Sequence, residues 1–375
     1  MALTVPSLCA QNEAPYRPSP VIKGAVWDFK RLIRLANTPG KGGSDLWPAT
    51  WAKDGNVYTG WGDGGGFEGA SDNVGRVSLG FARIIGFPPQ VKGVNVWGYY
   101  PKYAKHPTTF CGKAYSMLSV DGILYAWISS WYNPDAANFV RCAPNPRPPQ
   151  DRLAWSKNLA ATWTLSPWRL EEGPGQPTQF ASFLNFGMNY GHARDQYVYE
   201  YLRIRGEQNA TYLSRVRPAD LQKDPTRSGT YEYYTGRGPM WSAQVSKARP
   251  VFVDPNGREI MHVVYNPGLR RYIASVQGHG VGETGLFDAP EPWGPWTTVA
   301  YYRNWGGFGG RESLGVDFPT KWISRDGTIM WAVFSGGRLG RRDDALDSFN
   351  LVKLKLVLRT AGASVESQTA AHLPP

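Results

Sequence analysis

The chain has 375 residues, 42% of them hydrophobic, and a formal net charge of +11. It contains no apolar run of about eighteen residues, which excludes a transmembrane helix, and its scattered Lys and Arg residues form no dense basic arm for nucleic acid. Its 16 Trp, 20 Tyr and 43 Gly residues are typical of many short strands joined by tight turns.

The first predicted element is a β-hairpin over residues 44–67, in which alternating apolar residues flank an Asp-Gly turn. Asp45 and Asp63 stand near its two ends, and a hairpin that folds back on itself brings such residues together. Two carboxylates in an aromatic, glycine-lined cleft suit general acid and base chemistry on a sugar. Because Asp is also an ordinary turn residue, a structural role stays open for both.

The hairpin pattern recurs along the chain. Five copies cover residues 51–58, 118–127, 180–201, 263–272 and 322–331. Further strands are predicted after them, at residues 77–85, 154–170, 211–216, 285–302 and 349–358. Units of about four strands at this spacing predict an all-β, five-bladed β-propeller. The alternative, a two-layer sandwich, does not explain the repeat.

The expected domain organisation is a single catalytic propeller over residues 21–359, with an N-terminal extension over residues 1–20 and a disordered tail over residues 360–375. The basic surface either serves solvation or attracts an anionic glycan or cell-wall polymer. No signal peptide is visible, although we expect a secreted or periplasmic monomer. Cys111 and Cys142 either pair in an exported protein or remain buried free thiols.

Several kinds of chemistry are not expected from the sequence. It has no GxGxxG after a predicted strand and no phosphate-binding loop, which argues against a nucleotide enzyme. It has no HExxH, no CxxC and no Gly-x-Ser-x-Gly elbow, which argues against zinc and serine-hydrolase sites. We therefore expect neither a metal nor a cofactor.

Polar residues before the later predicted hairpins are candidates for lining a site. Lys113 leads into the second hairpin, and residues 189–195 form the densest polar cluster of the chain. Glu312 and Lys321 come near the last hairpin. An Arg-Asp pair is often a structural salt bridge and a Lys is often simply solvated, so these alternatives stay open.

A series of motifs resembles a known bacterial family. They are Asp45-Leu46-Trp47-Pro48-Ala49-Thr50-Trp51, Trp61-Gly62-Asp63-Gly64, Ala193-Arg194-Asp195-Gln196-Tyr197, Tyr265-Asn266, Glu291-Pro292-Trp293-Gly294-Pro295-Trp296 and Phe318-Pro319-Thr320-Lys321-Trp322. The chain is similar to a domain-of-unknown-function family that includes glycoside hydrolase family 183, the endo-D-arabinanases. The resemblance runs from about Val26 to Leu358 and departs from the pattern at Gly191-His192. It implies a five-bladed propeller that hydrolyses arabinofuranosidic links, with Asp45 and Asp63 as the catalytic pair.

The predicted function is therefore hydrolysis of a polysaccharide, with Asp45 as base or nucleophile and Asp63 as acid, or with these roles exchanged. Trp47 is expected to form a sugar platform beside Asp45, because residues two apart on an extended strand point the same way. The alternatives are a lyase acting on a uronate-containing glycan and a non-catalytic glycan-binding propeller. Substrate contacts are expected from Trp47, Lys113, Tyr190, His192, Arg194, Asp195, Tyr265, Glu312 and Lys321. Asp45, Asp63, Arg194 and Asp195 are expected to converge in one pocket.

Overall fold

The computed structural model describes most of the chain between residues 14 and 360. The described ranges are 14–35, 44–68, 77–98, 112–129, 151–170, 175–204, 206–207, 209–236, 238–256, 260–277, 284–307, 313–336 and 348–360. Glu312, Cys111, Cys142 and the predicted tail beyond residue 360 lie outside them. Within these ranges, no helix has the length and apolar character needed to cross a bilayer.

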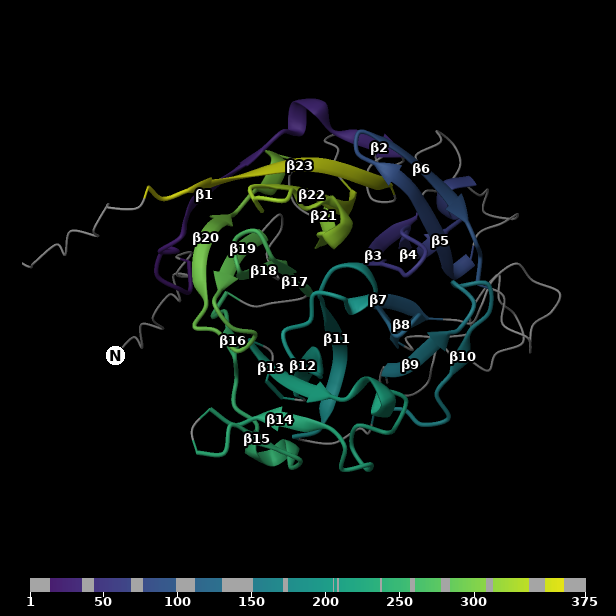
Figure 1. Ribbon diagram of the computed structural model, residues 1–375, viewed down its shortest axis with the longest axis vertical. Coiled ribbons are helices and arrows are strands. Elements are labelled where there is room, and N and C mark those ends of the chain that lie inside the picture. Colours follow the sequence, from purple (N-terminus) through teal and green to yellow (C-terminus); the bar gives the residue numbers. More distant parts are fainter. Residues whose placement is uncertain are drawn as a thin grey trace, which may run out of the picture.

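The described chain is built from antiparallel sheets arranged around a common centre (Figure 1). One sheet contains β3 (Asp45–Trp51), β4 (Val57–Gly64), β5 (Val77–Phe87) and β6 (Gln90–Asn95). The next contains β7 (Lys113–Val120), β8 (Ile123–Ser129), β9 (Asp151–Ser156) and β10 (Thr164–Leu165). A third contains β21 (Ser313–Asp317), β22 (Ile329–Gly336), β23 (Phe349–Leu358) and β1 (Ile22–Trp27), with β2 (Ile33–Leu35) also paired to β23.

The fourth sheet has ten strands. It contains β11 (Pro177–Asn185), β12 (Val198–Ile204), β13 (Ala210–Val216), β14 (Glu232–Tyr234), β15 (Trp241–Ser242), β16 (Phe252–Val253), β17 (Ile260–Asn266), β18 (Arg271–Gln277), β19 (Thr284–Ala289) and β20 (Thr297–Tyr302). Two antiparallel runs meet where β11 and β17 pair in parallel over only two residue pairs. The all-β prediction is confirmed, whereas the count of five blades stays a prediction because pairing joins the strands into four sheets.

Short 3-10 helices interrupt the connections between strands. They are η1 (Phe29–Arg31), η2 (Gly66–Glu68), η4 (Met188–Tyr190), η5 (Pro218–Asp220), η6 (Val245–Lys247), η7 (Trp305–Gly307) and η8 (Thr320–Trp322). The predicted fifth hairpin over residues 322–331 is wrong in its first strand, because β22 pairs with the earlier strand β21 and the chain between them forms η8 and a turn.

The strands nearest the centre in Figure 1 are β3, β7, β11, β17 and β21. They run in the same direction, because β11 and β17 pair in parallel and the contacts of β3 with β7 and β21, and of β7 with β11, follow the same order along both strands. Near their carboxyl ends the Thr50 hydroxyl donates to Asn185 Oδ1 at 2.7 Å, and the Ser119 backbone N–H donates to the Thr50 oxygen at 2.9 Å. One end of the assembly therefore carries the amino ends of all five inner strands, here called the amino end. The carboxyl end carries the tight turn between β7 and β8 and its counterparts.

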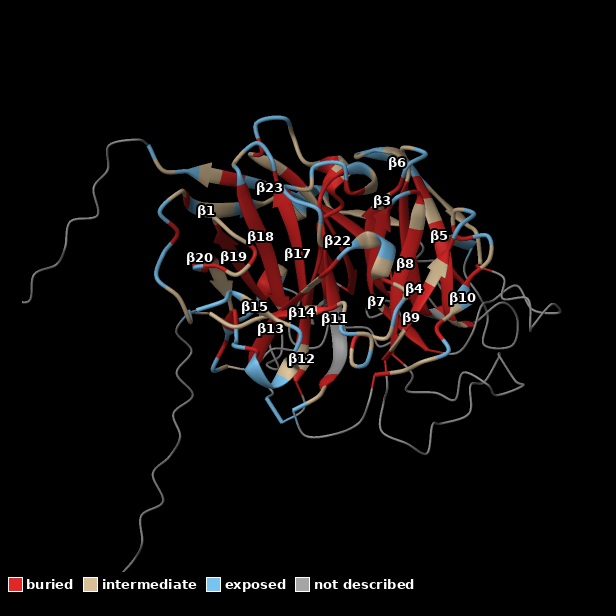
Figure 2. Ribbon diagram, turned by 60° about the horizontal axis from the view of Figure 1, so that its bottom comes forward, coloured by how far each residue is buried: buried red, intermediate tan, exposed pale blue. Residues whose placement is uncertain are grey.

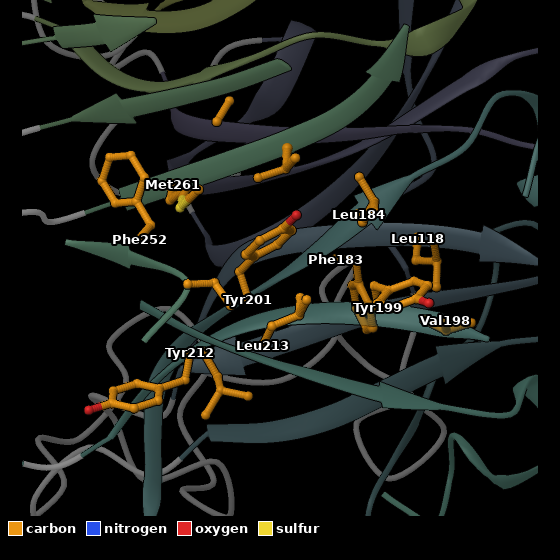
Figure 3. Close-up of a cluster of buried hydrophobic side chains, with 14 of the residues drawn as sticks. Leu118, Phe183, Leu184, Val198, Tyr199, Tyr201, Tyr212, Leu213, Phe252 and Met261 are labelled. Carbon is orange, nitrogen blue, oxygen red and sulfur yellow. The ribbon is translucent and has the colours of Figure 1, made fainter. Parts of the chain in front are cut away.

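Side chains between the sheets form the hydrophobic core. Figure 2 shows that the strands are mostly buried and that exposed residues gather in the turns. Part of the largest cluster is drawn in Figure 3, where Phe183 and Leu184 of β11 lie beside Tyr199 and Tyr201 of β12 and Leu213 of β13. Burying a side chain of this size stabilises the fold by roughly 1.5–3 kcal/mol, so the contacts between sheets are the main source of stability.

Chain segments far apart in sequence also meet at the edges. Tyr16 and Pro18, in the predicted N-terminal extension, contact β16 and β20: the Val253 backbone N–H donates to the Tyr16 hydroxyl at 2.6 Å, and Pro18 bridges to Thr298. At the other extreme, β1 pairs along β23, which places strands from both ends of the chain in one sheet. The domain limits drawn from the sequence stay a prediction.

Glu200 of β12 is a buried carboxyl that the sequence analysis did not single out. It is 3% exposed, and its Oε2 atom lies 3.5 Å from the Ser214 hydroxyl on β13. Burial raises the pKa of Glu200 from 4.5 to about 8, against weaker opposing effects of Trp127 and Ser214. The folded state therefore holds this carboxyl in its neutral form at mildly acidic pH.

We expect Glu200→Gln to remove a pH dependence of stability. Since the folded pKa of about 8 exceeds the unfolded value of 4.5, stability contributed by the neutral acid is complete below pH 4.5 and is lost as pH rises toward 8. The slope approaches about 1.4 kcal/mol per pH unit. Urea unfolding at pH 5 and pH 8 checks this: relative to the wild type, the variant should have a more favourable stability at pH 8 than at pH 5. An equal difference in unfolding free energy between variant and wild type at pH 5 and at pH 8 would contradict the prediction.

Candidate functional site

Two charged residues meet at the amino end of the inner strands. Asp45 is the first residue of β3 and Lys113 is the first residue of β7. Both side chains face Gly62 on β4: a Cβ atom there would collide with Asp45 Oδ1 and would lie 3.2 Å from Lys113 Nζ. The carboxylate and the ammonium are therefore neighbours that share the space left by the missing side chain of Gly62.

The side chains of Asp45 and Lys113 are largely buried. Lys113 is 8% exposed, and its Nζ donates a hydrogen bond to the Ser78 carbonyl of β5 at 3.0 Å. Asp45 is half-buried, and its Oδ1 atom is shielded from solvent. Opposite charges attract more strongly in such a low-dielectric setting than in water.

Asp63, the second predicted catalytic residue, follows Gly62 on β4, and Gly62 is the register partner of Asp45 on β3. The predicted hairpin is thus confirmed, and it brings the two chain positions side by side. The side chain of Asp63 lies outside what the structure describes, so its distance from the Asp45 carboxyl stays a prediction.

The predicted sugar platform at Trp47 is wrong. Trp47 is fully buried, and its indole Nε1 donates to the carbonyls of Ser44 and Ser348 at 2.9 and 3.1 Å. Leu46 and Trp47 have φ angles of 75° and 62°, and the register of β3 shifts there. This bulge breaks the alternation on which the prediction depended, and it turns the Trp47 ring into the core against Phe349.

The other predicted substrate-binding residues within the described ranges lie at the opposite end. Tyr190, His192, Arg194 and Asp195 follow the carboxyl end of β11, Tyr265 is next to the last residue of β17, and Lys321 follows β21. Since the inner strands are parallel, these residues are separated from Asp45 and Lys113 by the length of a strand. The predicted convergence of Asp45 with Arg194 and Asp195 in one pocket is therefore wrong.

Arg194 makes structural contacts at the carboxyl end. Its Nη1 lies 3.1 Å from Glu291 Oε2, and its guanidinium carbon lies 6.0 Å from the ring centre of Tyr265 and 5.9 Å from that of Tyr272. These contacts tie the loop after β11 to the turn between β19 and β20. The structural alternative left open by the sequence is thus the better description of Arg194.

The neighbours of Arg194 in sequence also hold the loop. Asp195 accepts hydrogen bonds from the Tyr197 backbone N–H at 2.9 Å and from the Tyr199 hydroxyl at 2.6 Å. Tyr190 is buried, which raises the pKa of its hydroxyl well above 10, and that oxygen accepts from the Tyr199 backbone N–H at 3.2 Å. His192 is exposed.

Lys321 lines a small pocket of about 290 Å³ at the carboxyl end, together with Pro88, Trp331 and their neighbours. Its Nζ lies 4.6 Å from the ring centre of Phe87. Burial lowers the pKa of Lys321, with a smaller opposing effect from Asp54. It therefore contributes to a surface remote from Asp45.

The sequence analysis missed a buried pair between two inner strands. His262 Nδ1 on β17 lies 3.7 Å from Asp317 Oδ2 on β21, and the same oxygen accepts the Ala49 backbone N–H at 2.8 Å. Burial lowers the pKa of His262, against the opposing attraction of Asp317. A polar residue inside an otherwise apolar strand was the available signal. Among the described residues, no group of three or more His, Cys, Asp or Glu side chains could hold a metal ion.

Comparison with known families identifies the kind of domain. The family DUF4185, described as a domain of unknown function, matches residues 99–312, more than half of the chain. The chain belongs to this family, which confirms the resemblance to a domain-of-unknown-function family. No curated protein sequence matches the chain significantly.

Solved structures share the fold at low sequence identity. A predicted hydrolase from Bacteroides ovatus is 13% identical, with a TM-score of 0.53 over 85% of this chain and 87% of its own. The family 117 glycoside hydrolase Zg3597 from Zobellia galactanivorans is 9% identical, with a TM-score of 0.51 over 89% and 91%. The β-xylosidase RS223 is 10% identical, with a TM-score of 0.50 over 88% and 98%. At these identities the likeness concerns the fold alone.

We expect the Arg194–Glu291 pair to contribute little to stability. Its side chains are 44% and 36% exposed, so a double-mutant cycle with Arg194→Ala and Glu291→Ala should give a coupling below about 1 kcal/mol that shrinks in high salt. The control is the buried pair Arg271–Asp288, 2.7 Å apart, where Arg271→Ala should cost about 3 kcal/mol or more. A coupling energy for Arg194–Glu291 as large as the free-energy cost of Arg271→Ala would refute this.

Proposed function

We propose that the protein is a glycoside hydrolase whose reaction centre is the amino end of the inner strands, with an arabinofuranosidic polysaccharide as substrate. The observation that carries the proposal is the Asp45 carboxylate held against Lys113 over Gly62. The family resemblance and the fold shared with a glycoside hydrolase and a β-xylosidase support the reaction class. The arabinan specificity rests on the resemblance.

A five-bladed propeller is part of this proposal. The ten-stranded sheet divides naturally at the two-residue parallel pairing of β11 with β17, and each resulting run contributes one inner strand. With the three other sheets this gives five units around the centre. The amino ends of five inner strands then surround one site, which is why residues from β3 and β7 meet there.

The charge of Lys113 favours one division of labour between the two aspartates. A cation beside a carboxylate stabilises its charged form, so Asp45 is the base or nucleophile. Asp63 is then the acid that protonates the leaving oxygen. The separation of the two carboxyls distinguishes the stereochemical courses: about 5 Å corresponds to retention and roughly 6.5 Å or more to inversion.

The lyase alternative has weaker structural support. A lyase would need Lys113 close to Arg194 and to a base, either Tyr190 or His192. The parallel inner strands place Lys113 at the amino end and the other three residues at the carboxyl end. A polymer that is cleaved in a cell wall lies outside the cytoplasm, so a secreted or periplasmic monomer remains part of the proposal.

We expect Asp45→Asn and Asp63→Asn each to lower hydrolysis of D-arabinan by at least about a thousandfold, because each removes a proton-transfer or nucleophilic group. Release of reducing sugar checks this, and circular dichroism checks that the fold is kept. A variant with full activity would remove its residue from the mechanism. Tight binding of arabinan by the wild type without turnover would favour the non-catalytic alternative.

Gly62→Ala tests the arrangement without removing a charged group. Its Cβ would meet the ends of two side chains, Asp45 and Lys113, so we expect both to move while the fold survives and activity falls at least about tenfold. The matched control is Gly24→Ala, where a Cβ meets nothing within 4 Å. Similar activity of the two variants in the reducing-sugar assay would count against the proposed centre.

A further inference from the structure

A pocket larger than the one beside Lys321 also lies at the carboxyl end, remote from Asp45 and Lys113. Its volume is about 520 Å³, within the range usual for small-ligand sites. The turn between β7 and β8, the loop after β11 and the start of η5 surround it. Its lining includes Asp121, Asn189, Asp195, Tyr197, Arg217 and Ala219.

The polar groups of this pocket suit hydroxyl groups. Asp121 and Asp195 supply carboxylate acceptors, while Arg217 supplies guanidinium donors and lies 2.7 Å from Gln196 Oε1. A sugar hydroxyl both donates and accepts hydrogen bonds, so it can use neighbouring groups of both kinds. With two carboxylates and one guanidinium, the pocket does not favour a strongly charged ligand of either sign.

The apolar part of the lining complements the polar part. Ala193, Pro218 and Ala219 present small apolar surfaces, and the Tyr197 ring is half-buried beside them. Such surfaces cover the C–H faces of a sugar ring. Because Arg217 and Ala219 are exposed, the pocket is accessible from the solvent.

The loop that forms one wall is held in an unusual conformation. Asn189 and Tyr190 have φ angles of 51° and 65°, which non-glycine residues seldom adopt. Asn189 Oδ1 accepts hydrogen bonds from the Ser119 hydroxyl at 3.1 Å and from the Gly122 backbone N–H at 2.8 Å. Strain fixed in this way is often found where a surface is shaped for a ligand.

We propose that this pocket is a second carbohydrate-binding site, which holds a segment of the polysaccharide and does not cleave it. The identity of the polymer as arabinan rests on the proposed function. A chain bound at the carboxyl end keeps the same polymer near the amino end, which raises its effective concentration there.

Affinity electrophoresis in native gels that contain D-arabinan tests the site. The proteins are the full chain with Asp45→Asn, to prevent cleavage, and the same chain with Ala219→Trp or Arg217→Ala added. Ala219→Trp fills the pocket and Arg217→Ala removes its donors, so each should weaken retardation by about tenfold in apparent affinity. The matched control is Arg325→Ala, an exposed arginine at the same end outside the pocket, which should bind like its parent.

A kinetic measurement separates this site from the reaction centre. With Asp45 intact, Ala219→Trp should raise KM for the polymer more than KM for a short arabino-oligosaccharide. Equal binding by all variants would overturn the inference, as would failure of the parent to bind any member of a glycan array. A third outcome separates the two proposals: the parent binds a different glycan, Ala219→Trp abolishes that binding, and the wild type does not hydrolyse arabinan. This result would support the second binding site and contradict the proposed function.

Discussion

The structure depends on how the inner strands satisfy their backbone groups. Each inner strand borders the centre, where its neighbours are parallel, and within the described part of the chain only β11 and β17 pair there directly. Buried N–H groups on such edges need other acceptors. Polar side chains from adjacent inner strands provide them: Asp317 accepts from Ala49, and Thr50 accepts from Ser119. These side chains connect one sheet to the next where backbone pairing does not.

The same contacts fix the strands lengthwise and thereby position the proposed reaction centre. Once Thr50 and Ser119 are joined near the carboxyl ends, the first residues of the two strands, Asp45 and Lys113, fall at one level. Gly62 then allows the two side chains to approach. Thr50 and Ser119 therefore act on the proposed reaction centre only through position, whereas Asp45 and Lys113 carry the charge.

Much of this architecture could be predicted from residue patterns. Turn chemistry and alternation gave the all-β class and the first hairpin, including the proximity of Asp45 to the strand that bears Asp63. Alternation failed at Trp47, because two consecutive left-handed residues form a bulge that no local propensity indicates. The separation of Arg194 from Asp45 follows from the direction of the inner strands. Direction is a long-range property, and motif spacing does not contain it.

The pairing of β1 with β23 has a mechanical consequence. The strands are antiparallel, with Ile22 opposite Leu358, so the outer ends of both lie at the same end of the ladder. A force pulling these two ends apart loads the hydrogen bonds one after another, like a zipper, instead of shearing them together. The sheet in which β1 and β23 pair would thus yield at low force, even though its buried face makes it thermodynamically robust.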